Sequence, residues 1–252
     1  MDIGHSQLAA GDIVSKTFQR WFDNFGQVFV ISFVFTIPIF ILNAFILAGL
    51  PEVPDNVDDF NFGNFLARSL GGTIVSVLLS IVLTAALSYT FIKIYQGESV
   101  QPADALQAVL SNIGSIAIFA LIAAILTAIG FIMLIVPGFL AIIALSMGTP
   151  AILNERLNGV PAASRSFQLI SGNWGVALAV VAIGFVINII VSLAVGGIAA
   201  PGALSFPDFS NFGFIQSLVQ MAASALIAPI VPALATALYF ELKGRHEGFP
   251  SL

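Results

Sequence analysis

Ser15–Gly26 reads SKTFQRWFDNFG, and versions of this phrase occur three times in the 252-residue chain, each before a long apolar run. The third copy, Ser164–Gly175, reads SRSFQLISGNWG and aligns with the first without a gap. A shorter second copy, Leu106–Gly114, keeps the Gln, the Asn and the final Gly. The repetition predicts three copies of one structural unit within a single membrane domain, residues 1–252. The predicted units are residues 9–95, 101–157 and 160–243, with a cytoplasmic tail at 244–252.

The composition places the chain in a lipid bilayer. Hydrophobic residues make up 58% of the sequence, and charged residues only 8%. Soluble domains carry about 25% charged residues, so a chain of this length with so few charges cannot cover its surface in water. The net charge of −5 argues against nucleic acid as a partner, because nucleic acid requires a basic patch. The absence of cysteine excludes disulfides and thiol chemistry.

Six apolar stretches are long enough to span a membrane, whose hydrocarbon core of about 30 Å requires roughly 20 helical residues. We expect helices because an open sheet cannot satisfy its backbone in lipid. The third and fourth spans share Ala105–Asn154 and turn either at Gly130 or at Pro137 and Gly138. The other predicted spans are Phe25–Gly49, Leu70–Ile92, Gly175–Ile198 and Ile215–Phe240.

The basic residues predict the orientation, because cytoplasmic loops of membrane proteins carry an excess of Lys and Arg. With the N-terminus inside, the outer segments hold Arg68 as their only basic residue, while their acidic residues include Asp59 and Asp208. Both termini are therefore expected in the cytoplasm. The inner segments hold Lys16, Arg20, Lys93, Arg156, Arg165, Lys243 and Arg245.

Each repeated phrase should form a short amphipathic helix at the cytoplasmic interface, followed by a transmembrane hairpin. Two spans per unit give the three units the same orientation, as parallel repeats. At the corner, the Asn would cap the entering helix, the next residue would anchor at the headgroups, and the Gly would permit a bend. The same side chains could instead form a lipid or partner-binding site. Its candidate residues are Asn24, Asn112, Asn173, Trp174, Arg165, Glu155 and Arg245.

The centres of the spans contain no Asp, Glu, Lys, Arg or His, which argues against a pump or a proton-coupled transporter. Small and hydroxyl residues recur at four-residue spacing on spans 2 and 5, so they share a helix face. They fit close helix packing with hydrogen bonds across the seam, or a polar crevice for a headgroup or small solute. Pro38, Pro229 and Pro232 should kink spans 1 and 6. The polar stripe residues are Ser76, Ser80, Thr84 and Ser88 on span 2, and Asn188 and Ser192 on span 5.

No catalytic arrangement is predicted. The two histidines, His5 and His246, lie in the tails, and no metal-binding or phosphate-binding motif is present, so no metal site and no cofactor is expected. The charged residues at the cytoplasmic rim fit ion pairs at helix ends, or a surface for a headgroup or a partner protein.

Several motifs together resemble a known family. They are Gly11–Ile13 with Lys16 and Phe18, Val136–Phe139, Pro150–Glu155, Ala162–Phe167 with Asn173 and Trp174, and Tyr239–Phe249. Their order and spacing resemble bacterial proteins with a glycerophosphoryl diester phosphodiesterase membrane domain. The resemblance implies a six-helix domain of the bacterial inner membrane. Some relatives carry a catalytic barrel behind this domain, but this chain ends at Leu252, so we do not expect that enzymatic activity here.

The sequence therefore favours a non-enzymatic membrane protein that binds or organises lipid, or a partner protein, at the cytoplasmic interface. One alternative is a passive transporter, channel or lipid-moving protein that uses the polar stripes. Another is a lipid-modifying enzyme, which would require Glu155, Arg165, Glu241 and Arg245 around one cytoplasmic pocket. Membrane lipids are the expected partners, and a second copy of the chain or another membrane protein is the alternative. The ligand and the oligomeric state stay open.

Overall fold

The computed structural model describes residues 9–49, 62–199 and 212–247, and in these ranges the chain is all-helical. Six segments within them are long and apolar enough to cross a membrane. This confirms the expectation of an all-helical protein with six candidate spans. The helices are α1 (Ala10–Asp23), α2 (Phe25–Gly49), α3 (Phe62–Tyr95), α4 (Pro102–Ser111), α5 (Ile113–Met133), α6 (Ile135–Leu145), α7 (Gly148–Glu155), α8 (Gly159–Ile170), α9 (Trp174–Ala199), α10 (Phe212–Ile227) and α11 (Ile230–Glu247).

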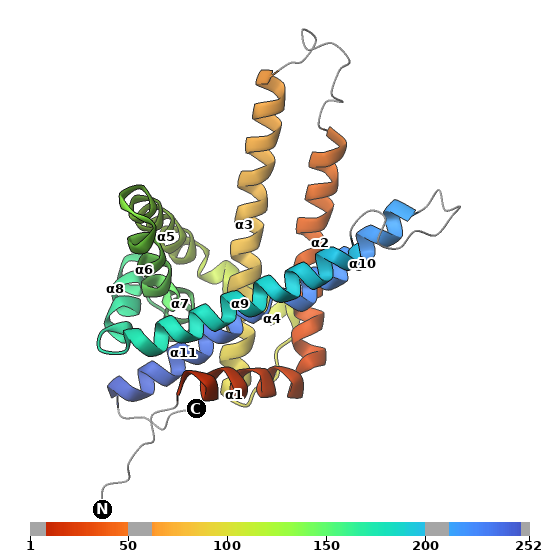
Figure 1. The fold of residues 1–252 in the computed structure, drawn as a ribbon. Coiled ribbons are helices and arrows are strands. Elements are labelled where there is room, and N and C mark those ends of the chain that lie inside the picture. Colours follow the sequence, from red (N-terminus) through yellow and green to blue (C-terminus); the bar gives the residue numbers. More distant parts are fainter. Residues whose placement is uncertain (1–8, 50–61, 200–211, 248–252) are drawn as a thin grey trace, which may run out of the picture.

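Three helical hairpins diverge from a common base (Figure 1). They are formed by α2 with α3, α5 with α6, and α9 with α10, and α11 continues the third hairpin back into the base. The short helices α1, α4, α7 and α8 complete the base. The predicted outer loops, with Asp59 and Asp208, fall in 50–61 and 200–211, and these residues and 248–252 of the predicted tail lie outside the described part of the chain.

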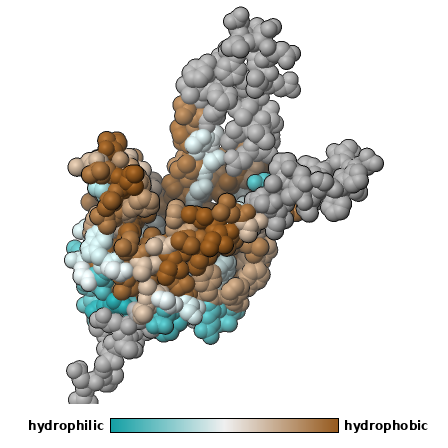
Figure 2. All heavy atoms as spheres, viewed as in Figure 1, coloured by the Kyte–Doolittle hydropathy of each residue, from teal (hydrophilic) through white to brown (hydrophobic). Residues whose placement is uncertain are grey.

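The buried core lies in the base, where α3, α7, α8 and α11 meet. Phe91 of α3, Ile152 of α7, Leu169 of α8 and Tyr239 of α11 are all fully buried. By contrast, only 17% of the span residues are buried in α5 and in α9, and their exposed side chains are largely Leu, Ile, Val and Phe. Figure 2 shows this division, with apolar hairpins above a base that carries the polar residues. Apolar surface of this extent requires lipid or other helices around it.

Each short helix that carries the repeated phrase packs on a hairpin that does not directly follow it. Helix α1 lies against α9 and α11, α4 lies against α3, and α8 lies against α5 and α6. The short helices therefore join the hairpins to one another. The apolar faces expected from the pattern are only partly buried, because Phe22, Leu106, Leu110 and Phe167 are exposed. The buried residues include Ile13, Thr17 and Trp21 in α1, Ala105 and Val109 in α4, and Ala162, Ser166 and Ile170 in α8.

The turn between spans 3 and 4 lies at neither predicted position. Helix α5 ends at Met133, and the extended residue Leu134 leads directly into α6. The two glycines have another role, because a Cβ added to Gly130 would lie 2.8 Å from the Cα of Gly138. They permit the close approach of α5 and α6 just below the turn.

Spans 4 and 6 are interrupted helices. The sixth span breaks between Ile227 and Ile230, at Pro229, which was predicted to kink it. Pro38 is accommodated inside α2, and Pro232 lies in the first turn of α11. The fourth span breaks between α6 and α7, without a proline at the break.

A side chain from α8 satisfies the backbone at the break between α6 and α7. The Ser166 hydroxyl donates to the carbonyl oxygen of Ala144 at 2.6 Å and accepts the backbone N–H of Met147 at 3.2 Å. All three groups are buried. Lipid offers no partner for free backbone groups, so a broken helix at membrane depth requires such internal partners.

Candidate functional site

At the first two corners the Asn side chain bonds the helix that ends there, while its backbone carbonyl accepts the first N–H of the helix that begins. The Asn24 side-chain amide donates to the carbonyl of Arg20, and the Asn112 amide donates to that of Ala108, both at 2.9 Å. Both Asn residues have φ near −115°, outside the left-handed region. The predicted bend glycines also have ordinary φ, and in the third copy the left-handed residue is Gly172, at φ 84°. The Asn therefore caps the entering helix through its backbone and not through its side chain, and the bend does not use the conformational freedom predicted for the glycine.

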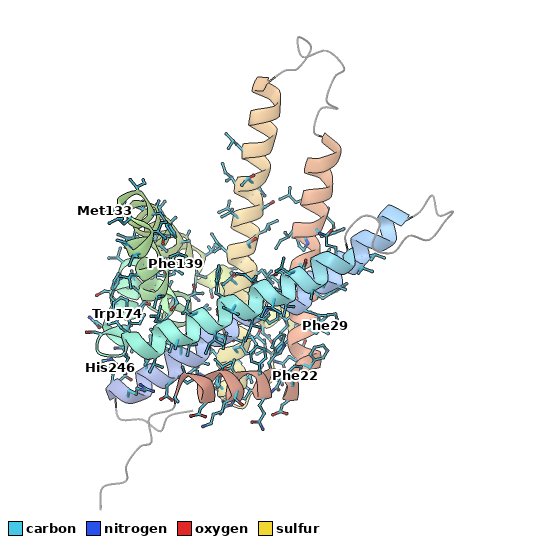
Figure 3. The ribbon with its side chains drawn as sticks, viewed as in Figure 1. Phe22, Phe29, Met133, Phe139, Trp174 and His246 are labelled. Atoms are coloured by element: carbon cyan, nitrogen blue, oxygen red, sulfur yellow. The ribbon has the colours of Figure 1, made fainter. Side chains whose placement is uncertain are left out.

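The residue after each corner Asn remains substantially exposed. Phe25, Ile113 and Trp174 expose 41%, 41% and 39% of their surface. Phe22, one turn before Phe25, exposes 66%. Figure 3 shows Phe22 and Trp174 at opposite edges of the base. These apolar side chains lie where the hairpins leave the polar base, which is the level expected for interfacial anchors.

Glu155 and Arg165 belong to an ion-pair network between α7, α8 and α11. The Arg165 Nε lies 3.1 Å from Glu155 Oε2, and Arg165 also pairs with Glu247. Lys243 Nζ lies 3.1 Å from Glu155 Oε1, to which the Tyr239 hydroxyl donates at 2.6 Å. Burial opposes the charge of Arg165, but its hydrogen bonds to Glu247 and Glu155 prevail and raise its pKa. The guanidinium therefore stays charged.

Asn173 and Arg245 form a second group with Glu241. Arg245 Nε lies 2.9 Å from Glu241 Oε1, and Arg245 Nη1 donates to Asn173 Oδ1 at 3.0 Å. Glu241 is fully buried, and the Arg245 side chain is only 9% exposed. The charges that a lipid-modifying enzyme would need thus gather along α11, but in two internally paired groups instead of around one pocket.

A polar cavity of about 670 Å³ lies between the inner end of α3, helix α4 and the end of α7. Of the predicted lipid-binding residues, it includes Asn112. Its volume falls within the usual range of small-molecule sites. Tyr89 and Leu153 add apolar surface to its wall. The charged lining residues are Lys93, Glu98, Asp104 and Arg156, and the amides and hydroxyls come from Ser99, Gln107, Ser111 and Asn112.

An apolar cavity of about 230 Å³ lies where the three hairpins meet. From the stripe on span 2 it includes Thr84 and the buried Ser88, and from span 5 it includes Gly184. Most of the remaining wall is apolar. The other lining residues include Ile142, Pro150, Val180, Phe185, Val231 and Leu234.

The polar stripes do not form the predicted seam along their whole length. Ser80 is exposed, and its hydroxyl donates to the carbonyl of Ser76 in the same helix at 2.8 Å, instead of to a second helix. Ser192 is also exposed. Asn188 is half-buried, and its hydrogen bond to another helix stays a prediction.

Arg156 belongs to the charged residues at the cytoplasmic rim, for which ion pairs or a headgroup surface were expected, but it was not among the candidate binding residues, and neither was Ser166. Arg156 adopts a left-handed backbone at the end of α7, with φ 55° and ψ 38°. The nearby Asn158 and Gly159 are a turn signal, but they point to a turn after Arg156 and not to the residue that is left-handed. Comparison of the chain with models of protein families, with curated proteins and with solved structures found no match.

Proposed function

We propose that this chain is a non-enzymatic integral membrane protein of the bacterial inner membrane that binds lipid at a cytoplasmic base. The polar cavity beside Lys93 carries the proposal. Lys93 is near the end of a candidate span, and Asn112 directly precedes another, so the cavity lies at the level where the spans begin. A cavity that holds charged groups beside the ends of apolar spans suits a molecule with a polar head and an apolar tail.

The three-unit organisation forms part of this proposal, and the buried positions support it. Thr17, Ala105 and Ser166 occupy one position of the aligned phrases and are all buried. The next equivalent set, Trp21, Val109 and Ile170, is buried as well. Equivalent positions of the three distant segments are therefore all buried.

The packing of the short helices also supports three units around one axis. Helix α1 of the first unit packs on the third hairpin, α4 of the second packs on the first, and α8 of the third packs on the second. The contacts therefore form a closed cycle, in which the short helix of each unit packs on the hairpin of the unit before it, and that of the first unit packs on the third hairpin. Three parallel repeats around one axis would produce such a cycle.

The basic residues of the base support a cytoplasmic location. Lys16, Lys93, Arg165 and Lys243 belong to this end of the molecule, and such residues are enriched on the inner side of membranes. Both termini are then cytoplasmic. The exposed Phe22 and Trp174 would reach the headgroup level around the base. The bacterial inner membrane comes from the family resemblance alone.

The two alternatives receive less support. A passive transporter would require a polar path along Ser80, Thr84 and Asn188, but the cavity at this stripe has a mostly apolar wall and suits an acyl chain better than a hydrated solute. The lipid-modifying enzyme considered above would require Glu155, Arg165, Glu241 and Arg245 around one pocket, but these four side chains pair with one another and with neighbouring side chains.

Native mass spectrometry of the protein purified from its membrane tests the proposal. We expect the protein to retain phospholipid after detergent washing that strips bulk lipid. A control membrane protein with six spans, purified in the same way, measures the annular lipid. Retention no greater than that of the control would contradict lipid binding.

Cysteine labelling tests the orientation, because the chain has no native cysteine. A membrane-impermeant thiol reagent should label Ser15→Cys only in inside-out vesicles and Asn56→Cys only in intact spheroplasts. The reverse pattern would place the base on the outer side.

A further inference from the structure

Two cationic and two anionic side chains line the polar cavity, and they differ in whether other protein groups pair with them. Lys93 and Glu98 neutralise each other through an ion pair of 2.9 Å. Asp104 accepts the backbone N–H of Gln101 at 3.1 Å, which fixes the carboxylate at the start of α4 without neutralising it. Arg156 is exposed, and no residue in 9–49, 62–199 or 212–247 forms an ion pair or hydrogen bond with its side chain. One anion on α4 and one cation after α7 therefore remain for a ligand.

The backbone of Arg156 gives a second, independent observation. Among the described residues other than glycine, Arg156 alone has a positive φ. At the end of a helix this conformation is normally taken by Gly or Asn, because a Cβ makes it unfavourable. Residues in such conformations concentrate at functional sites. An arginine at this position makes the backbone less stable, while its side chain pairs with no group in the described part of the chain.

The chemistry of the free charges indicates the ligand. A guanidinium binds phosphate with two parallel hydrogen bonds, which a single ammonium cannot reproduce. The Asp104 carboxylate accepts hydrogen bonds from an ammonium group. The cavity as a whole has no formal charge, since Lys93 and Arg156 balance Glu98 and Asp104. A ligand that carries one phosphate and one ammonium matches this arrangement better than an anion does.

We infer that the cavity binds the zwitterionic headgroup of a phospholipid, with its phosphate on Arg156 and its ammonium on Asp104. This inference rests on the proposed function. The position beside Tyr89 and Asn112, where α3 and α5 leave the base, lets the acyl chains remain among the spans. A soluble phosphoethanolamine ester presents the same phosphate and ammonium, so the experiment has to separate the lipid from the free ester.

The test measures lipid binding by native mass spectrometry in nanodiscs of equal parts phosphatidylethanolamine and phosphatidylglycerol. We expect the wild type to retain phosphatidylethanolamine preferentially. Arg156→Gly should bind it about 10- to 100-fold more weakly, the factor for loss of a hydrogen-bonded charge. Asp104→Asn keeps an acceptor for the N–H of Gln101 and should lose the preference between the two lipids. Lys16→Gln removes a cation from α1, outside the cavity, and should bind like the wild type.

The outcomes separate the two proposals. If the wild type retains no lipid, the proposed function falls. If it retains lipid and Arg156→Gly retains as much with the same preference, lipid binding stands and this site is wrong. If an equal concentration of soluble glycerophosphoethanolamine displaces the lipid, the cavity binds the free ester, and the proposal that it binds a lipid headgroup is wrong. Thermal unfolding confirms that Arg156→Gly is folded, since glycine suits its backbone.

Discussion

Two groups of charged residues in the base differ in how far they satisfy one another. Along α11, Arg165 and Arg245 lie within ion pairs to glutamates, and Arg245 and Glu241 are removed from solvent. Beside α4, Arg156 is exposed without a protein partner in the described ranges, and its backbone is left-handed. A charge that the fold already satisfies holds helices together, whereas a charge that the fold leaves open can bind a ligand.

The largest effect should follow from breaking the buried pair. Arg245→Ala removes a cation from the fully buried Glu241, and loss of one partner of a buried pair costs about 3–5 kcal/mol. Thermal unfolding in detergent should show a large fall in Tm. Replacing both residues with Leu should restore most of the stability. If the double variant is as unstable as the single one, the pair is not what stabilises this contact.

A smaller loss is expected three residues after Arg156, where the chain is tightly packed. A Cβ at Gly159 would lie 2.7 Å from the backbone nitrogen of Phe119 and the carbonyl of Ser115, both in α5. Gly159→Ala should therefore destabilise the protein by about 1–3 kcal/mol. Gly175→Ala is the matched control, because its added Cβ would lie within 4 Å of no atom other than those of its chain neighbours and its own helix backbone. Equal unfolding temperatures for the two variants would contradict the close contact of α8 with α5.

In contrast to the two preceding substitutions, Arg156→Gly should increase the stability of the protein, by about 1 kcal/mol, because glycine adopts φ 55° without strain. Arg156→Ala removes the same charge and keeps the Cβ, so its unfolding temperature should stay near that of the wild type. The comparison isolates the backbone from the side chain. A lower Tm for Arg156→Gly than for Arg156→Ala would show that the left-handed conformation carries no cost.

The smallest change in stability is expected at the edge of the base. Phe22 exposes 66% of its surface, so Phe22→Ser should change the free energy of unfolding by less than about 0.5 kcal/mol in detergent. Its neighbour Trp21 is 7% exposed and packs in the core, and Trp21→Ala should cost about 3–5 kcal/mol. Chemical denaturation of both variants measures the difference. Similar losses would mean that α1 buries a different face.

Local signals in the sequence predicted much of the fold. The first span was expected at Phe25–Gly49, which is where α2 lies. The fifth was expected at Gly175–Ile198, and α9 extends one residue beyond this range at each end. The three amphipathic helices also lie where the repeated phrase predicts them. Apolar runs and helical periodicity carry this information within short segments.

The site depended on contacts between distant segments, and these were not predictable. Ion pairs among the rim charges were expected, but the sequence does not tell that Arg165 pairs with Glu155 and Glu247 while Arg156 pairs with no charge among the described residues. It also does not tell which hairpin each short helix packs on. Arg156, and not Asn158 or Gly159, is the left-handed residue of this turn, while Gly159 permits the close approach of α8 to α5.

The most direct test measures bound phosphatidylethanolamine and Tm together in the wild type, Arg156→Gly and Arg165→Ala. The sequence made Arg165 a candidate lipid ligand, while its ion pairs make it structural. We predict that Arg156→Gly loses the lipid and melts higher, and that Arg165→Ala melts lower and keeps the lipid below its Tm. Loss of lipid in Arg165→Ala with full retention in Arg156→Gly would contradict this division between the two groups.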